Sequence, residues 1–344
     1  MDRFLFNIGN KLIGDGYCLI QTMSDTKTSN IKANIDLTNT LTDIGLDMMR
    51  FSILDEEDIR AIKEVKKNTS IPLIADIHYN YLFALSAIEN GIDKIRINPG
   101  NIGGESNLRK VILKAKEYNV PIRIGVNSGS LNKYKGKTDN EIDDYFLALD
   151  ETLNIFKDEN FNNLVLSLKS TSISKTQELY SKAYYKYPYP LHIGLTEAGR
   201  GQEGIIKSTI ALFPLLNQGI GDTIRVSLAD NRIEEIRACK NLLKYAGRIN
   251  LPTLIVCPTC GRTKVDVKEI ADELKVFLDK IKKDIKIAVM GCPVNGLGEA
   301  KDTDIGITGS GNKNEYILFS KGKEIGKYNK VEAIEKLKKF IIKF

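Results

Sequence analysis

The sequence of 344 residues contains no tryptophan and only two histidines. So few histidines all but exclude a zinc or iron site built mainly on histidine ligands. No stretch approaches the roughly 18 apolar residues that a membrane span needs. The apolar run at the N-terminus is too short and too broken for a signal peptide. We therefore expect a cytoplasmic protein that does not bind a membrane.

Two nucleotide-binding motifs are also absent, because the chain has neither a Walker A sequence nor a dinucleotide-binding glycine fingerprint. The net charge is +6, from 50 basic and 44 acidic residues. This surplus looks spread along the chain, so it does not indicate nucleic-acid binding. The composition is that of a globular protein with enough apolar residues for one large or two ordinary domains.

Short apolar runs alternate with longer amphipathic segments over the first two thirds of the chain. The apolar runs predict eight strands, at Tyr17–Met23, Met48–Leu54, Ile71–His78, Lys94–Pro99, Val120–Asn127, Asn163–Lys169, Leu191–Thr196 and Asp222–Leu228. The segments between them predict helices, for example Glu56–Asn68, Tyr81–Asn90, Leu108–Tyr118, Asp139–Asp158 and Glu234–Tyr245. Eight strand–helix units over roughly 230 residues favour an α/β fold of the (β/α)8 TIM-barrel type. A doubly wound open sheet is the alternative.

The pattern changes near Arg248–Pro252, which we interpret as a joint between domains. The later segments predict strands at Thr253–Val256, Ile285–Met290, Tyr316–Phe319 and Glu324–Tyr328, helices at Val267–Lys283 and from Val331, and a turn-rich stretch at Asp302–Asn314. We therefore divide the chain into a TIM-barrel substrate-binding domain, residues 1–247, and a small α/β domain, residues 248–344.

Basic residues gather at the C-terminal ends of the predicted barrel strands, where barrel enzymes carry their active sites. Five cations come from five different strands: Arg50, Arg96, Arg123, Lys169 and Arg225. Asp76 and Glu197 are the matching acids. Because an unpaired buried charge is costly, this excess favours an anionic substrate over internal salt bridges. Guanidinium groups bind phosphate oxygens in a bidentate manner, so a diphosphate fits.

Further polar residues follow the same strand ends, namely His78, Asn127 and Ser227. Glu197 could donate or accept a proton there, or form a structural salt bridge. The glycine-rich segment 100–104 after the fourth strand could add backbone N–H groups to a phosphate site. His192 precedes its strand end, and we expect it to be a packed strand residue.

Three of the five cysteines lie in the last quarter of the chain, as Cys257-x-x-Cys260 and Cys292. Three thiolates with an unfilled fourth position are typical of a metal centre that does chemistry, whereas structural zinc sites have four protein ligands. An iron–sulfur cluster therefore fits better than a structural zinc ion with a borrowed ligand. Glu299, in a glycine-flanked loop, could supply an exchangeable oxygen ligand to the fourth iron.

Taken together, these motifs resemble those of the 4-hydroxy-3-methylbut-2-enyl diphosphate synthases, iron–sulfur enzymes of the methylerythritol phosphate route to isoprenoids. The resemblance covers nearly the whole chain and suggests the short, two-domain bacterial type. It rests on the segments Gln21–Ser24, Ala75–His78, Arg96–Gly103, Gly125–Leu131, Leu195–Gly199, Gly221–Ser227, Cys257–Arg262 and Met290–Cys292.

The resemblance implies a [4Fe–4S] cluster on Cys257, Cys260, Cys292 and Glu299. It also implies a diphosphate site, with Asn127 and Glu197 near the reacting carbons; the residues that would bind the diphosphate are Arg50, Arg96, Arg123, Lys169, Arg225 and Ser227. The implied reaction is the two-electron reductive ring opening of 2-C-methyl-D-erythritol 2,4-cyclodiphosphate with loss of water. The implied partners are ferredoxin or flavodoxin as electron donor and a second subunit in a head-to-tail homodimer.

One position departs from the family pattern, which usually has proline between the two glycines before the glutamate. Here that position is Leu297, so the loop that carries Glu299 loses the stiffness that proline confers.

Two rival functions stay open on the sequence alone. One is a non-redox barrel enzyme related to dihydropteroate synthase with a zinc-stabilised tail, and the other is a non-catalytic cluster-bearing sensor or nucleic-acid binder.

Overall fold

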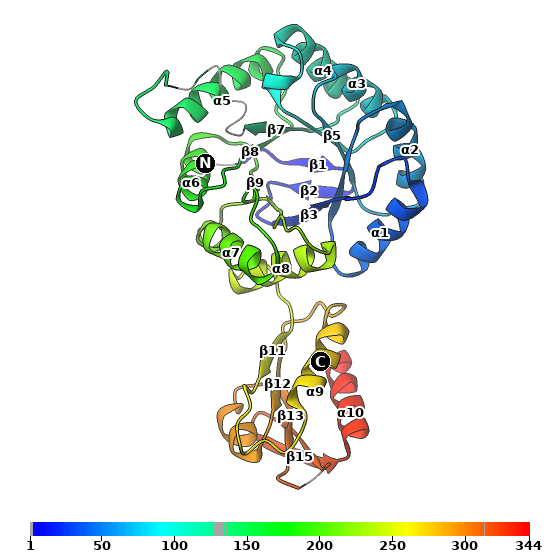
Figure 1. The fold of residues 1–344 in the computed structure, drawn as a ribbon, viewed down its shortest axis with the longest axis vertical. Helices are drawn as coiled ribbons and strands as arrows, with labels where there is room; N and C mark the ends of the chain where they lie inside the picture. Colours follow the sequence, from blue (N-terminus) through cyan, green and yellow to red (C-terminus); the bar gives the residue numbers. More distant parts are fainter. Residues whose placement is uncertain (1–2, 127–133, 135, 313) are drawn as a thin grey trace. The chain divides into compact units, whose positions relative to one another are not determined.

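The computed structural model describes residues 3–126, 134, 136–312 and 314–344, without the side chains of Val126, Asn295 and Glu299. The chain divides into two compact units, Met1–Arg248 and Ile249–Phe344 (Figure 1). Each unit has its own sheet and its own buried core, and each is described by itself below.

The first unit is a TIM barrel, as the sequence predicted. Its parallel strands are β3 (Leu19–Met23), β4 (Met48–Ser52), β5 (Leu73–Ile77), β6 (Lys94–Ile97), β7 (Ile122–Val126), β8 (Leu164–Leu168), β9 (His192–Ile193) and β10 (Thr223–Ile224). They pair in the order β8-β7-β6-β5-β4-β3-β10-β9. A parallel bridge between Leu166 and Leu191 joins the two ends of this order and closes the ring.

Helices surround the strands on the outside of the barrel (Figure 1). They are α1 (Ile31–Asp43), α2 (Glu56–Lys67), α3 (Tyr81–Glu89), α4 (Glu105–Glu117), α5 (Glu141–Asp158), α6 (Ile173–Lys186), α7 (Gly201–Asn217) and α8 (Arg232–Tyr245), with a short 3-10 turn η1 (Pro99–Asn101) before α4. Helix α2 shows how local sequence sets such a boundary. The Asp55 side chain accepts a hydrogen bond from the Asp58 backbone N–H, and acidic residues fill the first turn, where they favour the positive end of the helix dipole.

A short hairpin that the sequence analysis did not predict packs across the barrel. It consists of β1 (Phe6–Ile8) and β2 (Lys11–Ile13), which pair antiparallel. Ile8 and Ile13 are fully buried in an apolar cluster with Met48, Ile74 and Val165. Met48 is the first residue of its strand, so the hairpin covers the end where the strands begin. The opposite end, where the strands finish, remains available for a site.

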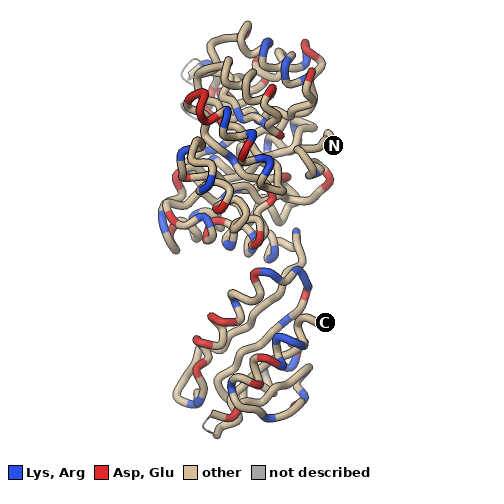
Figure 2. Tube along the Cα trace, turned by 90° about the vertical axis from the view of Figure 1, so that its right-hand side faces the viewer, with Lys and Arg blue, Asp and Glu red and all other residues tan. Residues whose placement is uncertain are grey.

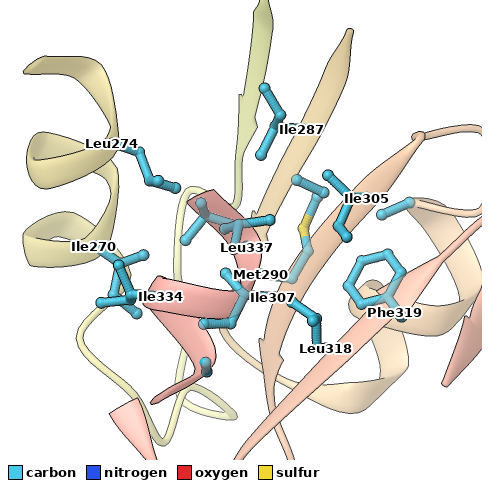
Figure 3. Close-up of a cluster of buried hydrophobic side chains, with 14 of the residues drawn as sticks. Ile270, Leu274, Ile287, Met290, Ile305, Ile307, Leu318, Phe319, Ile334 and Leu337 are labelled. Atoms are coloured by element: carbon cyan, nitrogen blue, oxygen red, sulfur yellow. The ribbon is translucent and has the colours of Figure 1, made fainter. Parts of the chain in front are cut away.

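The second unit is a five-stranded mixed sheet with two helices. Its strands are β11 (Thr253–Val256), β12 (Lys286–Met290), β13 (Ile305–Gly309), β14 (Tyr316–Ser320) and β15 (Lys323–Tyr328), in that order across the sheet. Helices α9 (Val267–Leu278) and α10 (Lys330–Lys343) pack on the sheet through residues such as Leu274 and Leu337 (Figure 3). A single π-helical segment, η3 (Val294–Glu299), follows β12.

Two predictions for this unit were wrong in part. The stretch expected to be only turns contains β13, whose five residues are all buried, because the strand lies between β12 and β14. The helix expected to reach Lys283 ends at Leu278. The other predicted elements of this unit are confirmed.

The positive charge is less evenly spread than we expected. Residues 249–344 contain 18 lysines and arginines against 13 aspartates and glutamates, so this unit carries five of the six surplus charges. Figure 2 shows residues of both signs along the helices of each unit. No helix among the described residues combines the length and apolar character needed to cross a membrane.

The contribution of the hairpin to the stability of the barrel can be tested by substitution. Ile8 is fully buried, so Ile8→Ala should lower the free energy of unfolding by about 2–5 kcal/mol through lost burial and the cavity left behind. The matched control is Leu12→Ala, because Leu12 belongs to the same hairpin but is 44% exposed. Urea unfolding followed by circular dichroism measures both. Equal, small effects of the two substitutions would show that the hairpin is not part of the barrel core.

Candidate active site

A cavity of about 300 Å³ opens at the C-terminal ends of the barrel strands. Its walls bring together every described residue that the sequence predicted for the substrate, together with both matching acids: Arg50, Asp76, His78, Arg96, Arg123, Lys169, Glu197, Arg225 and Ser227. The wall is completed by Met23, Gly125, Ser167, Leu195 and Thr196. Asn127, the remaining predicted residue of the barrel, lies outside the described residues.

Asp76 joins two of the cations at one side of the cavity. Its carboxylate lies 3.1 Å from Arg96 Nη1 and 3.6 Å from Arg50 Nε. His78 Nε2 is 3.6 Å from the same carboxylate. Burial opposes ionisation of Asp76, but Arg50, the contact with His78 and Arg96 outweigh it and hold the pKa of Asp76 well below its usual range. Asp76 is therefore an anion that fixes cations, and it has no proton to donate near neutral pH.

Glu235 plays the same part for Arg225, and the sequence analysis missed it. Glu235 lies on α8, is 1% exposed, and accepts from Arg225 Nε and Nη2 at 3.3 Å each. It also accepts from Thr22 Oγ1 at 2.5 Å and from the Leu228 backbone N–H at 2.9 Å. Arg232 forms a second ion pair with it. No strand-end pattern points to a helix residue, although a glutamate on the apolar side of a helix was a usable signal.

Two cations of the cavity, Arg123 and Lys169, form no salt bridge with an acid among the described residues, although the charge of Asp76 partly offsets that of Arg123. Arg123 is 2% exposed, and its Nε and Nη1 atoms are buried without a hydrogen-bond partner. Burial first, and then the charges of Arg50 and Arg96, lower the pKa of Arg123 well below its usual value. Because a guanidinium keeps its proton in proteins, the cavity holds a buried charge that a bound anion would stabilise.

Lys169 lies in a comparable field. Loss of hydration, followed by the charges of Arg123, Arg225, Arg50 and Arg96, lowers the pKa of its amine well below the usual value. Unlike a guanidinium, an amine in this field can lose its proton. Lys169 is therefore the cation of this site whose charge depends on pH and on what is bound.

Two glycines make room for these side chains, Gly125 in β7 and Gly194 directly after β9. A Cβ atom at Gly194 would lie 2.8 Å from Lys169 Nζ, and one at Gly125 would lie 3.2 Å from Arg96 Nε. Both distances are tighter than ordinary van der Waals contact, so any side chain at these positions would push the cation away. The glycines belong to the site as much as the cations do.

Glu197 stands at the mouth of the cavity in a left-handed backbone conformation, with φ of 53°. This conformation costs a residue other than glycine roughly 1–2 kcal/mol. Its side chain is exposed and forms no ion pair with any other described residue. The salt-bridge interpretation of Glu197 is therefore not supported, and the carboxylate is free to face a ligand.

Lys94 and His192 lie fully buried in the barrel and do not line the cavity. Within the described part of the chain, the hydrogen-bond acceptor found for Lys94 Nζ is the Met48 sulfur, at 3.9 Å. His192 Nδ1 lies 2.8 Å from Thr223 Oγ1, which confirms the prediction of a packed strand histidine. The glycine-rich segment 100–104 is absent from the cavity lining, so the expected backbone contribution to phosphate binding is not seen there.

The three cysteines of the second unit lie on loops that touch one another. Cys257 follows β11 and Cys292 follows the neighbouring parallel strand β12, and the Cys257 backbone N–H donates to the Val289 carbonyl at 2.9 Å. The Cys260 backbone N–H donates to Thr263 Oγ1 at 3.1 Å. Thr263 in turn packs on Gly291, where a Cβ atom would lie 2.7 Å from Thr263 Oγ1. The loop of Cys257 and Cys260 is thus folded onto the residue that precedes Cys292.

All three thiols are free, with Cys257 and Cys292 buried and Cys260 exposed. As they stand, the described side chains include no group of three or more His, Cys, Asp and Glu residues that could hold a metal ion. The Glu299 side chain lies outside the described part of the chain. The three thiols and the adjoining loops fit a thiolate-bound cluster. The described side chains are not yet arranged as a set of metal ligands.

The fold and the cavity define the class of this protein. It is a TIM-barrel enzyme whose cavity, at the end of the barrel used for catalysis, carries an excess of fixed positive charge. Its second unit presents three free thiols on two touching loops.

The comparison with known proteins gives the family, because the chain belongs to the GcpE family. The model of the GcpE TIM-barrel domain matches residues 5–240, and that of the GcpE protein C-terminal domain matches residues 253–343. The chain is 44% identical over 343 residues to the 4-hydroxy-3-methylbut-2-en-1-yl diphosphate synthase (flavodoxin) of Caldanaerobacter subterraneus, covering 98% of this chain and 95% of the relative. It is 45% identical over 334 residues to the protein of that name from Ruminiclostridium cellulolyticum, covering 95% and 93%. The family predicted from the motifs is confirmed, and the chain is an oxidoreductase of that family.

Solved structures resemble the barrel at low sequence identity. Dihydropteroate synthase of Yersinia pestis has a TM-score of 0.50 at 11% identity, covering 67% of this chain and 93% of that one. The HPPK-DHPS protein of Plasmodium falciparum has a TM-score of 0.52 at 11% identity, covering 72% and 52%. At this level of identity the likeness supports the barrel fold alone.

The lowered pKa of Lys169 leads to a prediction about pH. A bound anion favours the ammonium form, so binding takes up a proton, and affinity should fall as the pH rises through the lowered pKa of Lys169. Lys169→Met should weaken the binding of inorganic pyrophosphate about tenfold near neutral pH, as expected for loss of a charged contact. It should also flatten the pH dependence, which isothermal titration calorimetry at several pH values measures.

The control is Lys182→Met, which removes a half-exposed lysine of α6 that pairs with Glu178. This variant should bind pyrophosphate as the unmodified protein does. If Lys169→Met keeps the full pH dependence, the titrating group is not Lys169.

Proposed function

We propose that this chain catalyses the reductive ring opening and dehydration of 2-C-methyl-D-erythritol 2,4-cyclodiphosphate to 4-hydroxy-3-methylbut-2-enyl diphosphate. The relatives carry the product of this reaction in their name. The observation that supports the substrate class is the pair of cavity cations that form no salt bridge with a described acid, Arg123 and Lys169. A diphosphate supplies the negative charge that these two groups lack, with phosphate oxygens that guanidinium groups bind in pairs.

The roles of the barrel residues follow from their surroundings. Arg50, Arg96, Arg123 and Arg225 bind the diphosphate oxygens together with Lys169 and Ser227. Asp76 and Glu235 form ion pairs with three of the guanidiniums, Arg50, Arg96 and Arg225, so little orientation has to be fixed when the substrate arrives. This rigid set of cations also holds the substrate in one place, which the reaction at its carbon atoms requires.

The acid–base group of the proposal is Glu197. Departure of a hydroxyl group as water needs a proton, and Glu197 is the carboxylate at the cavity mouth that no cation of the described chain neutralises. Asn127 is assigned near the reacting carbons from the resemblance alone. His78, next to Asp76, is assigned to substrate binding at the rim.

The cofactor of the proposal is a [4Fe–4S] cluster on Cys257, Cys260 and Cys292, with Glu299 as the fourth ligand. The chemistry that such a cluster supplies when bound is the transfer of two electrons, one at a time, from flavodoxin or ferredoxin. The touching cysteine loops and the free thiols support it. In place of the usual proline, Leu297 packs against the core of the second unit, so burial can hold the segment before Glu299.

The two alternative functions suggested by the sequence are less well supported. A non-redox enzyme related to dihydropteroate synthase shares only the barrel fold with this chain, and a non-catalytic sensor does not need cations focused inside a barrel. Neither rival agrees with membership of a family of reductive enzymes.

The test of the function is anaerobic purification followed by spectroscopy and turnover. The expected protein is brown, with about four irons per chain, and converts the cyclic diphosphate when reduced flavodoxin is supplied. Its reduced paramagnetic signal should change when the substrate is added. The matched control is Cys292→Ala, which should lose iron and turnover, whereas Cys239→Ala alters a buried barrel cysteine and should keep both. A colourless protein with one zinc, unchanged by anaerobic iron–sulfide reconstitution, would rule the proposal out.

The proposal includes a head-to-tail homodimer in which the second unit of one subunit serves the barrel of the other. Support comes from the placement of the cavity and the thiols on separate units. Arg123→Met and Cys292→Ala should each be inactive alone. Mixed dimers formed by co-expression should recover about a quarter of the wild-type activity, since half of the dimers are mixed and each has one intact site.

The control for this complementation is co-expression of Arg123→Met with Lys169→Met, which leaves no barrel intact and should give no more activity than Lys169→Met has by itself. No recovery with the first pair would show that each site is built within one chain. The reaction itself would be untouched by that result.

A further inference from the structure

The segment Gln21–Ser24 at the end of β3 has no assigned role in the proposed reaction. Thr22 is accounted for by its bond to Glu235. The Ser24 hydroxyl lies 2.6 Å from Asn34 Oδ1 at the start of the barrel helices. Met23 is different, because its side chain lines the cavity among the cations.

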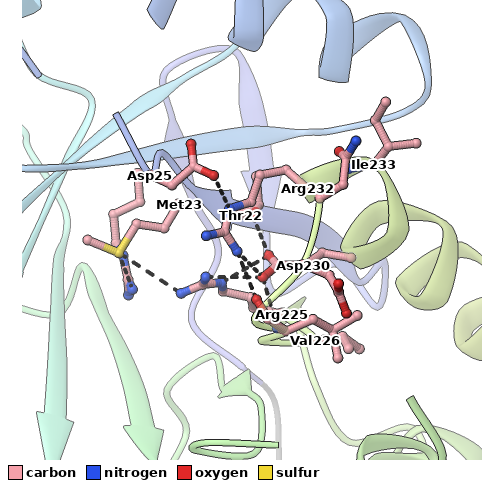
Figure 4. A network of polar contacts seen from close by, with 12 residues as sticks. Thr22, Met23, Asp25, Arg225, Val226, Asp230, Arg232 and Ile233 are labelled. Atoms are coloured by element: carbon pink, nitrogen blue, oxygen red, sulfur yellow. Dashed lines mark hydrogen bonds and ion pairs between the residues drawn. The ribbon is translucent and has the colours of Figure 1, made fainter. Parts of the chain in front are cut away.

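The Met23 sulfur contacts guanidiniums from both neighbouring strands (Figure 4). Arg50 Nη2 and Nε lie 2.8 Å and 3.2 Å from the sulfur, and Arg225 Nη1 lies 4.0 Å from it. Strand β3 runs between β4, which ends near Arg50, and β10, which ends just before Arg225. Met23 therefore stands between two guanidiniums that come from opposite sides.

These two guanidiniums repel each other. Burial lowers the pKa of Arg50 to about 10 despite Asp76, and the charge of Arg225 adds to that lowering. Each of the two is paired with a different acid, Arg50 with Asp76 and Arg225 with Glu235. Their mutual repulsion favours separation of the two groups, whereas a diphosphate needs them to converge.

We propose that Met23 is a positioning residue for the diphosphate site, whose thioether sulfur accepts weak contacts from Arg50 and Arg225 and keeps both turned toward the cavity. This inference rests on the proposed function for the identity of the anion. A thioether is a weak, polarizable acceptor without charge. It can orient two cations and leave their positive charge available to the substrate, whereas a carboxylate would neutralise them.

The alternative role of Met23 is packing alone, and two variants of similar size separate the two roles. Met23→Leu keeps an apolar side chain but has no acceptor atom. Met23→Gln keeps the unbranched length and replaces the sulfur with an amide that offers an oxygen acceptor. Positioning predicts that Gln is tolerated and Leu is not, and packing predicts the reverse.

The experiment measures the binding of inorganic pyrophosphate to the holoenzyme by titration calorimetry, and kcat and KM for the cyclic diphosphate. Met23→Leu should raise the Kd for pyrophosphate and the KM roughly three- to tenfold, as loss of weak contacts to charged groups implies, with kcat changed less than KM. Met23→Gln should stay within about twofold of the wild type in both.

The control is Met48→Leu, which replaces a fully buried barrel methionine outside the cavity and should change neither constant. Melting temperatures of all variants check the fold. Wild-type affinity in Met23→Leu, or an equal loss in Met23→Gln, overturns the inference. If the wild type binds pyrophosphate but does not turn over the cyclic diphosphate, the proposed function fails, while the pyrophosphate data still decide the role of Met23.

Discussion

Repulsion between like charges inside the barrel is the constraint on which the rest of the site depends. Five cations from five strands line one cavity, and their mutual repulsion must be offset by groups that do not fill the cavity. Asp76 does this from the cavity wall and Glu235 from helix α8, and Gly125 and Gly194 leave space for long basic side chains. The folded chain thereby retains an electrostatic strain that a polyanion relieves on binding, which is a common trade between stability and function.

The chain separates two kinds of chemistry between two independently packed units. The cluster of cations lies in the barrel, and the thiols lie in the smaller unit. That unit has a separate apolar core, which includes Ile270 and Leu337 (Figure 3). Reduction of a substrate held in the barrel requires the two kinds of group to meet. The proposed assembly of two subunits meets that requirement, and the apolar core of each unit stays unchanged.

Much of this organisation could be predicted from the sequence, and the reasons differ by element. The barrel strands were found because parallel strands read as short apolar runs, and the cations because the rule for strand ends applies to each run separately. Glu235 was missed because it reaches the site from a helix, and the rule for strand ends does not apply to helix residues. The hairpin was missed because its strands have three residues each, although Gly9-Asn10 between them is a recognised two-residue turn. The role of Met23 depends on contacts across strands, which a linear pattern does not contain.

The close approach of Lys169 to Gly194, and of Arg96 to Gly125, has a consequence for how this sequence can change over time. A side chain at Gly125 would push Arg96 away, and a Cβ atom at Gly194 would lie 2.8 Å from both Lys169 Nζ and the backbone oxygen of Arg225. A backbone oxygen cannot move aside as the end of a lysine side chain can, so shortening Lys169 would not by itself make room at Gly194. Positions 125 and 194 are thus expected to vary as little as the cations that they accommodate, although neither glycine has a side chain with which to touch a ligand.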